Sequence, residues 1–391
     1  MKKTNSFYIR TFGCKVNQYE TQLISDKYNK EKFTCVAKPE DAGVIIFNSC
    51  TVTAEADKEC EYLIRKSLKL PDHPKIIVTG CFAKNRTDYL KNKYPEAHIL
   101  TDKAELFCEP EKQTIKNFEK RSRAFVKIQD GCNSFCSYCI IPYIRNVLWS
   151  KPCQTVLEEI ETLVKNGYSE IVLTGIHVGK YEGGISPLLQ KIIQIPLDFR
   201  VRISSIELNE IDDKLISLMA ENPDKICRHL HIPLQSGSDE VLKAMNRKYG
   251  TKDYESKVSE ITRLMPDIAL TSDIITGFPS ETEKNHAETC LFLRKNPFAR
   301  FHIFRYSDRE GTKASKSISK VPQTEIKKRS KELFEIDIIK RTEFLNRHKK
   351  TIRKAVSSGK NKALTDNYIT VNECRLKEGI FDTEINENCE I

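Results

Sequence analysis

The sequence lacks the marks of an exported or membrane-inserted protein. Its first 15 residues include lysines but no apolar stretch of the kind found in signal peptides. No apolar run approaches the roughly 20 residues that cross a bilayer. The 14 cysteines in 391 residues are too sparse for a disulfide scaffold. We therefore expect a cytoplasmic protein without membrane contact, in which grouped cysteines are metal ligands or redox groups.

Acidic residues are scarce in one segment near the C-terminus. Between Lys313 and Lys362 there are 16 Lys/Arg and 5 Asp/Glu, a net charge of +11, whereas the whole chain carries +10. The remaining residues therefore sum to −1. Such a local excess predicts a polyanionic partner, either nucleic acid or a membrane surface, although a solvated helix face would show the same pattern.

Three strand patterns in the first 120 residues each run into a cysteine. The pairs are Ser6–Phe12 with Cys14, Gly43–Asn48 with Cys50, and Lys75–Gly80 with Cys81. Helical patterns at residues 18–29, 55–69 and 84–93 alternate with them, which predicts a Rossmann-like α/β domain over residues 1–120. Because ligands bind outside the carboxyl ends of such strands, the three thiols can meet at one edge. Ordinary buried cysteines are the alternative.

A second set of three cysteines lies directly after another strand pattern. Cys132, Cys136 and Cys139 have the spacing C-x3-C-x2-C within residues 124–146. A 4Fe–4S cluster is normally held by four thiolates, so three would leave one iron open to a small molecule. The alternatives are three buried thiols or half of a zinc site, but no C-x2-C or H-x3-H partner for a zinc site lies nearby.

Six strand patterns, each followed by a helical pattern, occupy residues 121–345. They are Ala124–Gln129, Glu170–Gly175, Arg200–Ser205, Arg228–Leu234, Ile268–Ile275 and Ala299–Tyr306. Six such units predict a partial TIM-type barrel, with its site at the carboxyl ends of the strands. A polar linker, residues 109–123, places the domain boundary near residue 120. His229 and His231 alternate on one strand, and we expect hydrogen-bonded core residues rather than metal ligands.

Small and polar residues follow several of these strands, as close approach and hydrogen bonding to a bound cofactor require. Each is a weak signal alone, because glycine and serine are also common in turns. The candidates for cofactor binding are Thr174, Gly175, Ser205, Glu207, Gln235, Ser236 and Gly277.

These motifs together resemble the radical S-adenosylmethionine (SAM) methylthiotransferases. TFGCKVNQYET, FNSCTVTAEAD and VTGC are similar to the N-terminal domain of that family. RAFVKIQDGCNSFCSYCIIPYIR, EIVLTGIHVGKY, SSIE, HLHIPLQSGSDEVLKAMNRKY and GFPSET resemble its radical SAM domain. The match covers about residues 6–340. Asn146, Val147 and Ser280 depart from the usual pattern.

The resemblance implies two 4Fe–4S clusters and SAM as cofactors. Cys14, Cys50 and Cys81 would hold an auxiliary cluster, and the C-x3-C-x2-C cysteines would hold the cluster that binds SAM. By the same resemblance, Glu207, Gln235 and the segment at Gly277 line the SAM pocket. The implied chemistry cleaves SAM to a 5′-deoxyadenosyl radical, takes sulfur from the auxiliary cluster and takes a methyl group from a second SAM.

Within the family, GCKVNQYET and NSCTVTAEAD resemble the branch acting on N6-threonylcarbamoyladenosine at tRNA position 37. The implied product carries a methylthio group at adenine C2. The alternatives are isopentenyladenosine-37 tRNA, a ribosomal protein aspartate, and a non-enzymatic iron–sulfur RNA-binding protein. We expect a monomer that works with a flavodoxin- or ferredoxin-type reductant.

The partner implied by the resemblance is a tRNA anticodon loop, whose bases can be splayed out and stacked. Tyr138, Tyr143 and Arg145 beside the cluster loop are candidates to contact the target base, with ordinary packing as the alternative. Family members normally end in a small RNA-binding β-barrel called TRAM. Residues 346–391 are short for one, and only Ala363–Asn372 resembles a strand of it. We therefore expect a reduced TRAM-like region.

Overall fold

The N-terminal sheet has the parallel order that the strand–helix alternation predicts. The computed structural model describes residues 5–108, 112–118, 122–359, 361–372 and 377–391. The first five strands lie side by side in the order β2-β1-β3-β4-β5. Their bounds are β1 Ser6–Thr11, β2 Thr34–Cys35, β3 Val44–Ser49, β4 Lys75–Gly80 and β5 His98–Ile99. The Rossmann-like prediction is confirmed, and the two strands that the sequence did not indicate are two-residue edge strands.

Four helices accompany this sheet. They are α1 Lys15–Lys30, α2 Ala54–Leu68, α3 Cys81–Asn85 and α4 Thr87–Lys93. The single helix predicted for residues 84–93 is wrong, because Arg86 leaves the helical conformation (φ −129°, ψ 37°) and separates α3 from α4. As a result α3 begins at Cys81 itself, directly after β4.

The central unit is an open barrel of six parallel strands, as predicted. The strands are β6 Ala124–Asp130, β8 Glu170–Gly175, β9 Arg200–Ile203, β10 His229–His231, β11 Ala269–Thr276 and β12 Arg300–Arg305. Bridges between Ser205 and His231 and between Val201 and Ile226 join its two sheets. Within the described residues, no pairing closes β12 onto β6. A short strand, β7 Trp149–Ser150, pairs antiparallel with β6. The predicted domain boundary near residue 120 lies outside the described residues.

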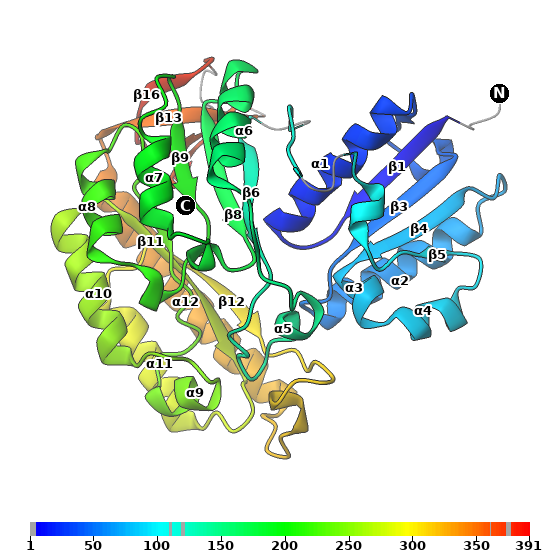
Figure 1. The fold of residues 1–391 in the computed structure, drawn as a ribbon. Coiled ribbons are helices and arrows are strands. Elements are labelled where there is room, and N and C mark those ends of the chain that lie inside the picture. Colours follow the sequence, from blue (N-terminus) through cyan, green and yellow to red (C-terminus); the bar gives the residue numbers. More distant parts are fainter. Residues whose placement is uncertain (1–4, 109–111, 119–121, 360, 373–376) are drawn as a thin grey trace.

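Helices cover the outside of the barrel. They are α6 Cys153–Lys165, α7 Ile185–Ile192, α8 Asp213–Glu221, α9 Asp239–Ala244, α10 Thr251–Leu264 and α11 Glu283–Lys295. In α6, Val156, Ile160 and Leu163 recur at helical spacing and are fully buried against the sheet. Figure 1 shows the N-terminal domain in blue beside this barrel, with the short helix α5 (Ile141–Ile144) at their junction.

The C-terminal segment follows the long helix α12, Gln323–His348, which continues past position 345. It forms five antiparallel strands in the order β16-β13-β14-β15-β17. They are β13 Ile352–Gly359, β14 Lys362–Thr365, β15 Thr370–Val371, β16 Ile380–Glu384 and β17 Cys389–Glu390. The single strand expected over Ala363–Asn372 is wrong. The chain turns back at residues 366–369, where Tyr368 adopts φ +69°.

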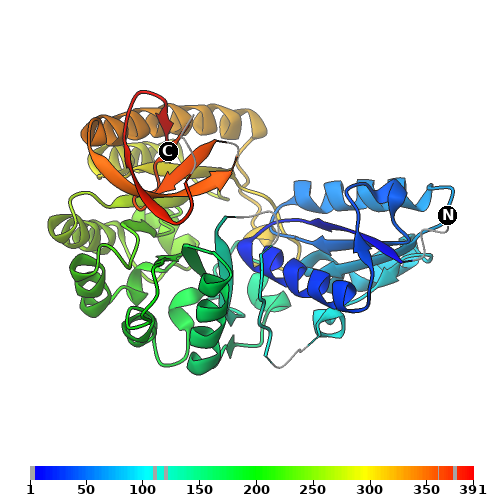
Figure 2. The same ribbon diagram turned by 90° about the horizontal axis from the view of Figure 1, so that it is seen from above.

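Hydrogen bonds from arginines of the barrel hold this sheet against the amino ends of the barrel strands. Arg200 and Arg202 on β9 pair with buried Glu170 on β8. Nη2 of each arginine also donates a hydrogen bond to a backbone carbonyl of the C-terminal segment, from Arg200 to Leu364 at 2.8 Å and from Arg202 to Thr365 at 2.9 Å. Figure 2 shows these strands, orange to red, beside α12. Since the sheet occupies the amino end, the carboxyl ends of the barrel strands stay open toward the N-terminal domain.

Among the described residues, no helix has the length and apolar character needed to cross a membrane.

Candidate iron–sulfur and cofactor site

The structure brings Cys14, Cys50 and Cys81 to one edge of the N-terminal sheet. Cys14 is the N-cap of α1, Cys50 follows β3, and Cys81 follows β4. Their strands are neighbours in the sheet, so their carboxyl ends lie side by side. Gly13 (φ +82°) lies so close that a Cβ added there would be 2.4 Å from Sγ of Cys50. The loops that carry these thiols are therefore tightly packed.

Hydrogen bonds from Asn17, which was not among the residues expected to have a role, hold these loops together. The amide Nδ2 of buried Asn17 donates to the carbonyls of Phe12 (2.9 Å) and Ser49 (3.0 Å). Asn48 in turn donates to the Asn17 carbonyl at 2.8 Å. Asn17 therefore links the loop that carries Cys14 to the loop that carries Cys50. The only feature of the sequence that could have indicated a role for Asn17 was its position within the motif GCKVNQYET.

Cys132, Cys136 and Cys139 lie on the loop between β6 and α5. The Cys139 N–H donates to the Cys136 carbonyl, and the Cys132 N–H donates to the carbonyl of Arg145, both at 3.0 Å. The hydroxyl of Ser137 donates to the Ala244 carbonyl at 2.8 Å, at the end of α9. The loop is thus held by hydrogen bonds of its own backbone and by a hydrogen bond to the end of α9.

Hydrogen-bond donors point at two of these sulfurs. Sγ of Cys132 lies 3.4 Å from Nδ1 of His177 and 3.5 Å from the backbone N of Ser134. Burial alone would raise the pKa of Cys132, but these contacts lower it below its usual value. Arg247 donates from Nη1 to Sγ of Cys136 at 3.4 Å. Burial raises the pKa of Cys139 to about 12, so iron binding itself must displace that proton.

The two cysteine trios suit a multi-iron cluster better than a single ion. In neither trio do all three sulfurs lie within 4.8 Å of one another, whereas ligands of one zinc ion lie about 3.8 Å apart at Zn–S distances of about 2.3 Å. A four-iron cluster binds each thiolate to a different iron, which separates the sulfurs more widely. Three thiolates per site are also the donor set that a four-iron cluster with one open iron requires, so the residues present fit such clusters in their chemistry.

A cavity of about 290 Å³ lies beside the second trio. Two of the predicted residues line it, Cys136 and Glu207. Glu207 is ion-paired with Arg247 across the cavity. The other lining residues are Asn133, Ser134, His177, Lys180, Asn209, Glu210, Asn246, Lys248 and Tyr249. His177 and Arg247 also line the cavity and lie in the motifs EIVLTGIHVGKY and MNRKY, although no role was expected for them from the sequence.

The remaining predicted SAM contacts lie at the same end of the barrel but outside this cavity. Thr174 and Gly175 end β8, Ser205 follows β9, Gln235 and Ser236 follow β10, and Gly277 follows β11. Ser236 is fully buried, and its hydroxyl pairs with Thr289 of α11 at 3.2 Å. Gly277 (φ +77°) packs against α12, where an added Cβ would be 2.4 Å from Ile326. Their contact with SAM stays a prediction.

The three candidates for substrate contact have different surroundings. Tyr143 is 52% exposed and packs edge-on against Phe135, which is 49% exposed. Tyr138 instead packs in an apolar cluster with Phe278. The guanidinium of Arg145 contacts Cys81, Glu20 and Asn17 of the N-terminal domain. Phe135 was not predicted as a candidate for substrate contact, because its exposure depends on the conformation of the loop. Its own φ in that loop is +45°.

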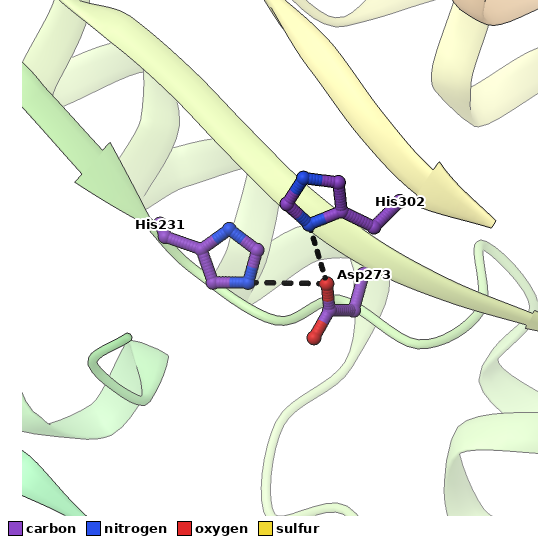
Figure 3. Close-up of side chains that lie close together, drawn as sticks. All are labelled: His231, Asp273 and His302. Carbon is purple, nitrogen blue, oxygen red and sulfur yellow. Dashed lines mark hydrogen bonds and ion pairs between the residues drawn. The ribbon is translucent and has the colours of Figure 1, made fainter. Parts of the chain in front are cut away.

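The barrel interior carries a chain of hydrogen-bonded side chains. Nε2 of His229 and Nδ1 of His231 lie 3.1 and 2.9 Å from the hydroxyl of Thr271. Asp273 Oδ1 lies 3.2 Å from His231 and 3.1 Å from His302 (Figure 3). The expectation that His229 and His231 are buried and hydrogen-bonded is confirmed. That His231 is not a metal ligand stays a prediction, because His231, Asp273 and His302 could together hold a metal ion.

Comparisons with known proteins agree with this architecture. Residues 6–102 match an uncharacterized protein family designated UPF0004, and residues 126–293 match the radical SAM superfamily. The chain is 39% identical to a threonylcarbamoyladenosine tRNA methylthiotransferase, MtaB, of Thermotoga maritima, covering 82% of this chain and 79% of the relative. It is 32% identical to the MtaB of Aquifex aeolicus, covering 94% and 96%. A tRNA-2-methylthio-N(6)-dimethylallyladenosine synthase of Clostridium botulinum is 35% identical, covering 84% and 81%.

Solved structures with the same fold are more distant in sequence. The radical SAM methyltransferase TsrM of Kitasatospora setae, solved with cobalamin and a 4Fe-4S cluster, superposes with a TM-score of 0.58 at 12% identity, covering 80% of this chain and 77% of that chain. The cobalamin-dependent SAM radical enzyme OxsB reaches 0.53 at 11% identity, covering 88% and 56%. These likenesses show the fold alone, and they support the partial barrel.

Proposed function

The chain belongs to the radical SAM methylthiotransferase family, and on that premise we propose that it methylthiolates adenine C2 of N6-threonylcarbamoyladenosine at tRNA position 37. The proposal rests on one observation. Both three-cysteine sites lie at the junction between the N-terminal domain and the open end of the barrel. One site suits SAM cleavage, and the other suits sulfur donation. The relatives named for threonylcarbamoyladenosine favour this nucleoside.

Cys132, Cys136 and Cys139 would hold the SAM cluster, and Cys14, Cys50 and Cys81 the auxiliary cluster. When bound, these clusters and SAM supply the electron, the radical, the sulfur and the methyl group that an unactivated aromatic C–H requires. The chain's own residues position and shield these groups. Asn17 braces the auxiliary loops, and Ser137 seats the SAM loop on α9. The two domains face each other across the site and limit the access of water.

The tRNA would contact the exposed surface around the SAM loop. Tyr143 and Phe135 present a pair of rings on which a splayed-out base can stack. The basic segment supplies phosphate contacts, since six of its cations on α12 and just after it are exposed: Lys327, Lys328, Lys331, Arg347, Lys349 and Lys350. This role accounts for the +11 charge without a membrane.

We further propose that the enzyme works as a cytoplasmic monomer with a flavodoxin- or ferredoxin-type reductant. The six proposed cluster ligands, Cys14, Cys50, Cys81, Cys132, Cys136 and Cys139, are free thiols, as a reducing compartment requires. Reductive cleavage consumes single electrons, which proteins of this type deliver.

The reaction is tested by nucleoside mass spectrometry on tRNA from a deletion strain. Loss of 2-methylthio-N6-threonylcarbamoyladenosine, restored by the wild-type gene but not by Cys132→Ala, is expected. Its persistence would refute the assignment. Loss of the methylthiolated isopentenyladenosine instead would favour the dimethylallyladenosine branch, to which some relatives belong.

The cluster assignment has a separate test. Anaerobically reconstituted wild-type protein should hold about eight irons and eight sulfides, as two four-iron clusters require. The Cys132/Cys136/Cys139→Ala variant should keep about four of each and lose formation of 5′-deoxyadenosine. A variant that loses all of its iron, or none, contradicts two independent sites.

A further inference from the structure

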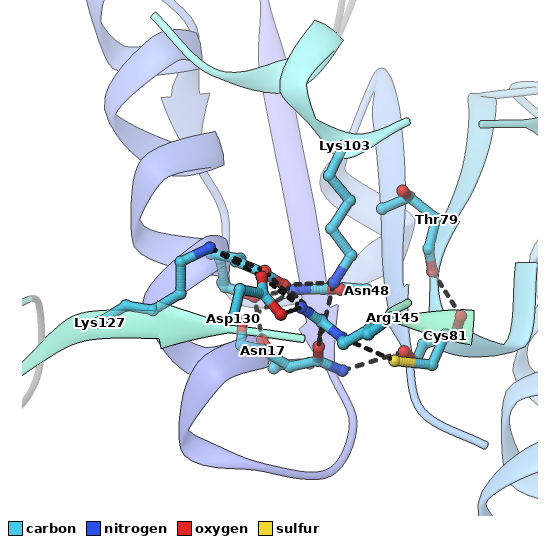
Figure 4. Close-up of polar contacts among 12 residues, drawn as sticks. Asn17, Asn48, Thr79, Cys81, Lys103, Lys127, Asp130 and Arg145 are labelled. Atoms are coloured by element: carbon cyan, nitrogen blue, oxygen red, sulfur yellow. Dashed lines mark hydrogen bonds and ion pairs between the residues drawn. The ribbon is translucent and has the colours of Figure 1, made fainter. Parts of the chain in front are cut away.

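Arg145 lies between the two cysteine trios and contacts both. Its backbone carbonyl accepts a hydrogen bond from the N–H of Cys132 at 3.0 Å. Its side-chain Nε donates to Sγ of Cys81 at 3.4 Å. Figure 4 shows the guanidinium reaching across the domain junction to Cys81. One residue therefore connects a ligand of one proposed cluster to a ligand of the other.

Acceptors from both domains hold the guanidinium in this position. Nη1 donates to both carboxylate oxygens of Asp130 at 2.8 Å and to Glu20 Oε1 at 3.0 Å. Nη2 donates to Glu20 Oε2 at 3.0 Å and to Asn17 Oδ1 at 3.1 Å. Every guanidinium nitrogen has a partner, so the direction of Nε toward Cys81 is fixed by the rest of the group.

The contact between Arg145 and Cys81 is shielded from water. Cys81 is 5% exposed and packs against Ile140 and Ile144 of the barrel side of the junction. A charged donor next to sulfur acts more strongly in such surroundings than in solvent, because the local dielectric constant is low. The buried carboxylates of Glu20 and Asp130 hold the charge in place.

We propose that Arg145 is a positioning residue that raises the reduction potential of the auxiliary cluster and sets that cluster's place relative to the SAM loop. The proposal rests on the proposed function, since it requires that Cys81 bind iron. Hydrogen bonds to cysteine sulfur and nearby positive charge stabilise the more negative, reduced form of an iron–sulfur cluster, which raises its potential. The substrate contact expected for Arg145 from the sequence stays a separate prediction.

The chain offers a matched pair of arginines for the test. Arg247 donates to Sγ of Cys136 over the same 3.4 Å that separates Arg145 from Cys81. Replacing Arg145 should therefore change one cluster, and replacing Arg247 should change the other. A residue with a merely structural role would not produce this reciprocal pattern.

The experiment is a redox titration of reconstituted protein followed by electron paramagnetic resonance. In Arg145→Lys, which keeps the charge but removes Nε, the auxiliary cluster should shift to a more negative potential while the SAM cluster keeps its own. The charge-balanced double variant Arg145→Gln/Glu20→Gln, which also lacks the Nε donor, should again shift it to a more negative potential. Arg247→Lys should shift only the SAM cluster. An unshifted auxiliary potential in both Arg145 variants, or equal shifts of both clusters, overturns the proposal.

Lys103→Gln is the control for charge alone. Lys103 pairs with Glu20 and with Asn17 in the same network, and among the described residues no hydrogen bond joins it to sulfur. It should move the auxiliary potential less than Arg145→Lys does. A shift as large as that of Arg145→Lys would mean that the hydrogen bond to sulfur is not responsible, and the proposal would fail.

Because the Arg145 variants could fail to fold, a second measurement uses a protein in which Arg145 is unchanged. The Cys132/Cys136/Cys139→Ala protein, labelled with 15N-arginine, would hold only the auxiliary cluster. Electron–nuclear double resonance should detect a coupled arginine nitrogen there, and its absence overturns the proposal. If this protein and the wild type assemble no cluster at Cys14, Cys50 and Cys81, the proposed function itself fails. Two assembled clusters with unshifted potentials refute only the role of Arg145.

Discussion

His177 lies with Nδ1 3.4 Å from Sγ of Cys132. Its other ring nitrogen, Nε2, is 2.6 Å from Oε1 of Glu210, so the carboxylate orients the ring toward the sulfur. Burial alone would lower the pKa of His177, but Cys132 and Glu210 raise it to about 9. A carboxylate, an imidazole and a metal-binding group in series is a common way to position a ligand.

Replacing His177 should weaken the SAM cluster and spare the auxiliary one. Outer partners of metal ligands typically contribute about 10- to 100-fold in metal affinity. His177→Gln should therefore lose iron from the SAM cluster faster under a chelator, with slower formation of 5′-deoxyadenosine. His286→Gln, at another buried histidine on α11, is the control. Equal rates of iron loss in His177→Gln and wild type would contradict the role of this contact.

Gly13→Ala should remove the auxiliary cluster selectively. The new Cβ would lie 2.4 Å from Sγ of Cys50, and the left-handed φ of +82° adds strain of about 1–2 kcal/mol. We expect the variant to keep about four irons and still cleave SAM, while forming no methylthiolated product. Gly167→Ala is the matched control, because Gly167 also has positive φ (+95°) but has nothing within 4 Å of an added Cβ. A Gly13→Ala protein with full iron content would refute the expected crowding.

The exposed ring pair should contribute to tRNA binding. Stacking of a base on an aromatic side chain contributes about 1–3 kcal/mol, or about 5- to 150-fold in Kd. Tyr143→Ala and Phe135→Ala should weaken binding of anticodon stem-loop RNA within this range, measured by fluorescence anisotropy at fixed salt. Cluster content should not change. Tyr62→Ala, at a tyrosine 56% exposed on α2, should leave the Kd unaltered. Equal affinities for all three variants would exclude this surface.

Stability should fall at mildly acidic pH because of His348 at the end of α12. Burial, together with Arg353 and Arg347, lowers the pKa of His348 to about 4, although Asp267 and Asp366 act in the opposite direction. The unfolded chain has a histidine pKa of about 6.5 and binds the proton first. The stabilising contribution is therefore complete above pH 6.5 and is lost as the pH falls toward 4.

The measurement is the thermal unfolding midpoint of wild type and His348→Gln between pH 7 and pH 4.5. Both proteins lose stability as carboxylates titrate, but the wild type should lose more, because only it must keep a buried histidine neutral. Parallel curves for the two proteins would show that His348 does not titrate across this range in the way its surroundings require.

The sequence by itself determined the local features of this protein. The spacing of Cys132, Cys136 and Cys139 is a covalent property of a short loop, and the strand and helix periods depend on neighbouring residues. Parallel topology then places Cys14, Cys50 and Cys81 at one edge, since their strands end at the same side of the sheet. The family resemblance added the cofactors and the tRNA substrate.

Only the tertiary structure decided which way the polar side chains of the site turn. Arg145, a candidate for substrate contact, enters a buried network with Glu20, which is 125 positions away in the chain. Phe135 came to the surface through its backbone conformation, and Glu170 joined β8 and β9 to the C-terminal sheet. A buried charge must be paired wherever packing brings an opposite charge within reach. That pairing depends on the contact between folded domains, which short-range sequence patterns do not encode.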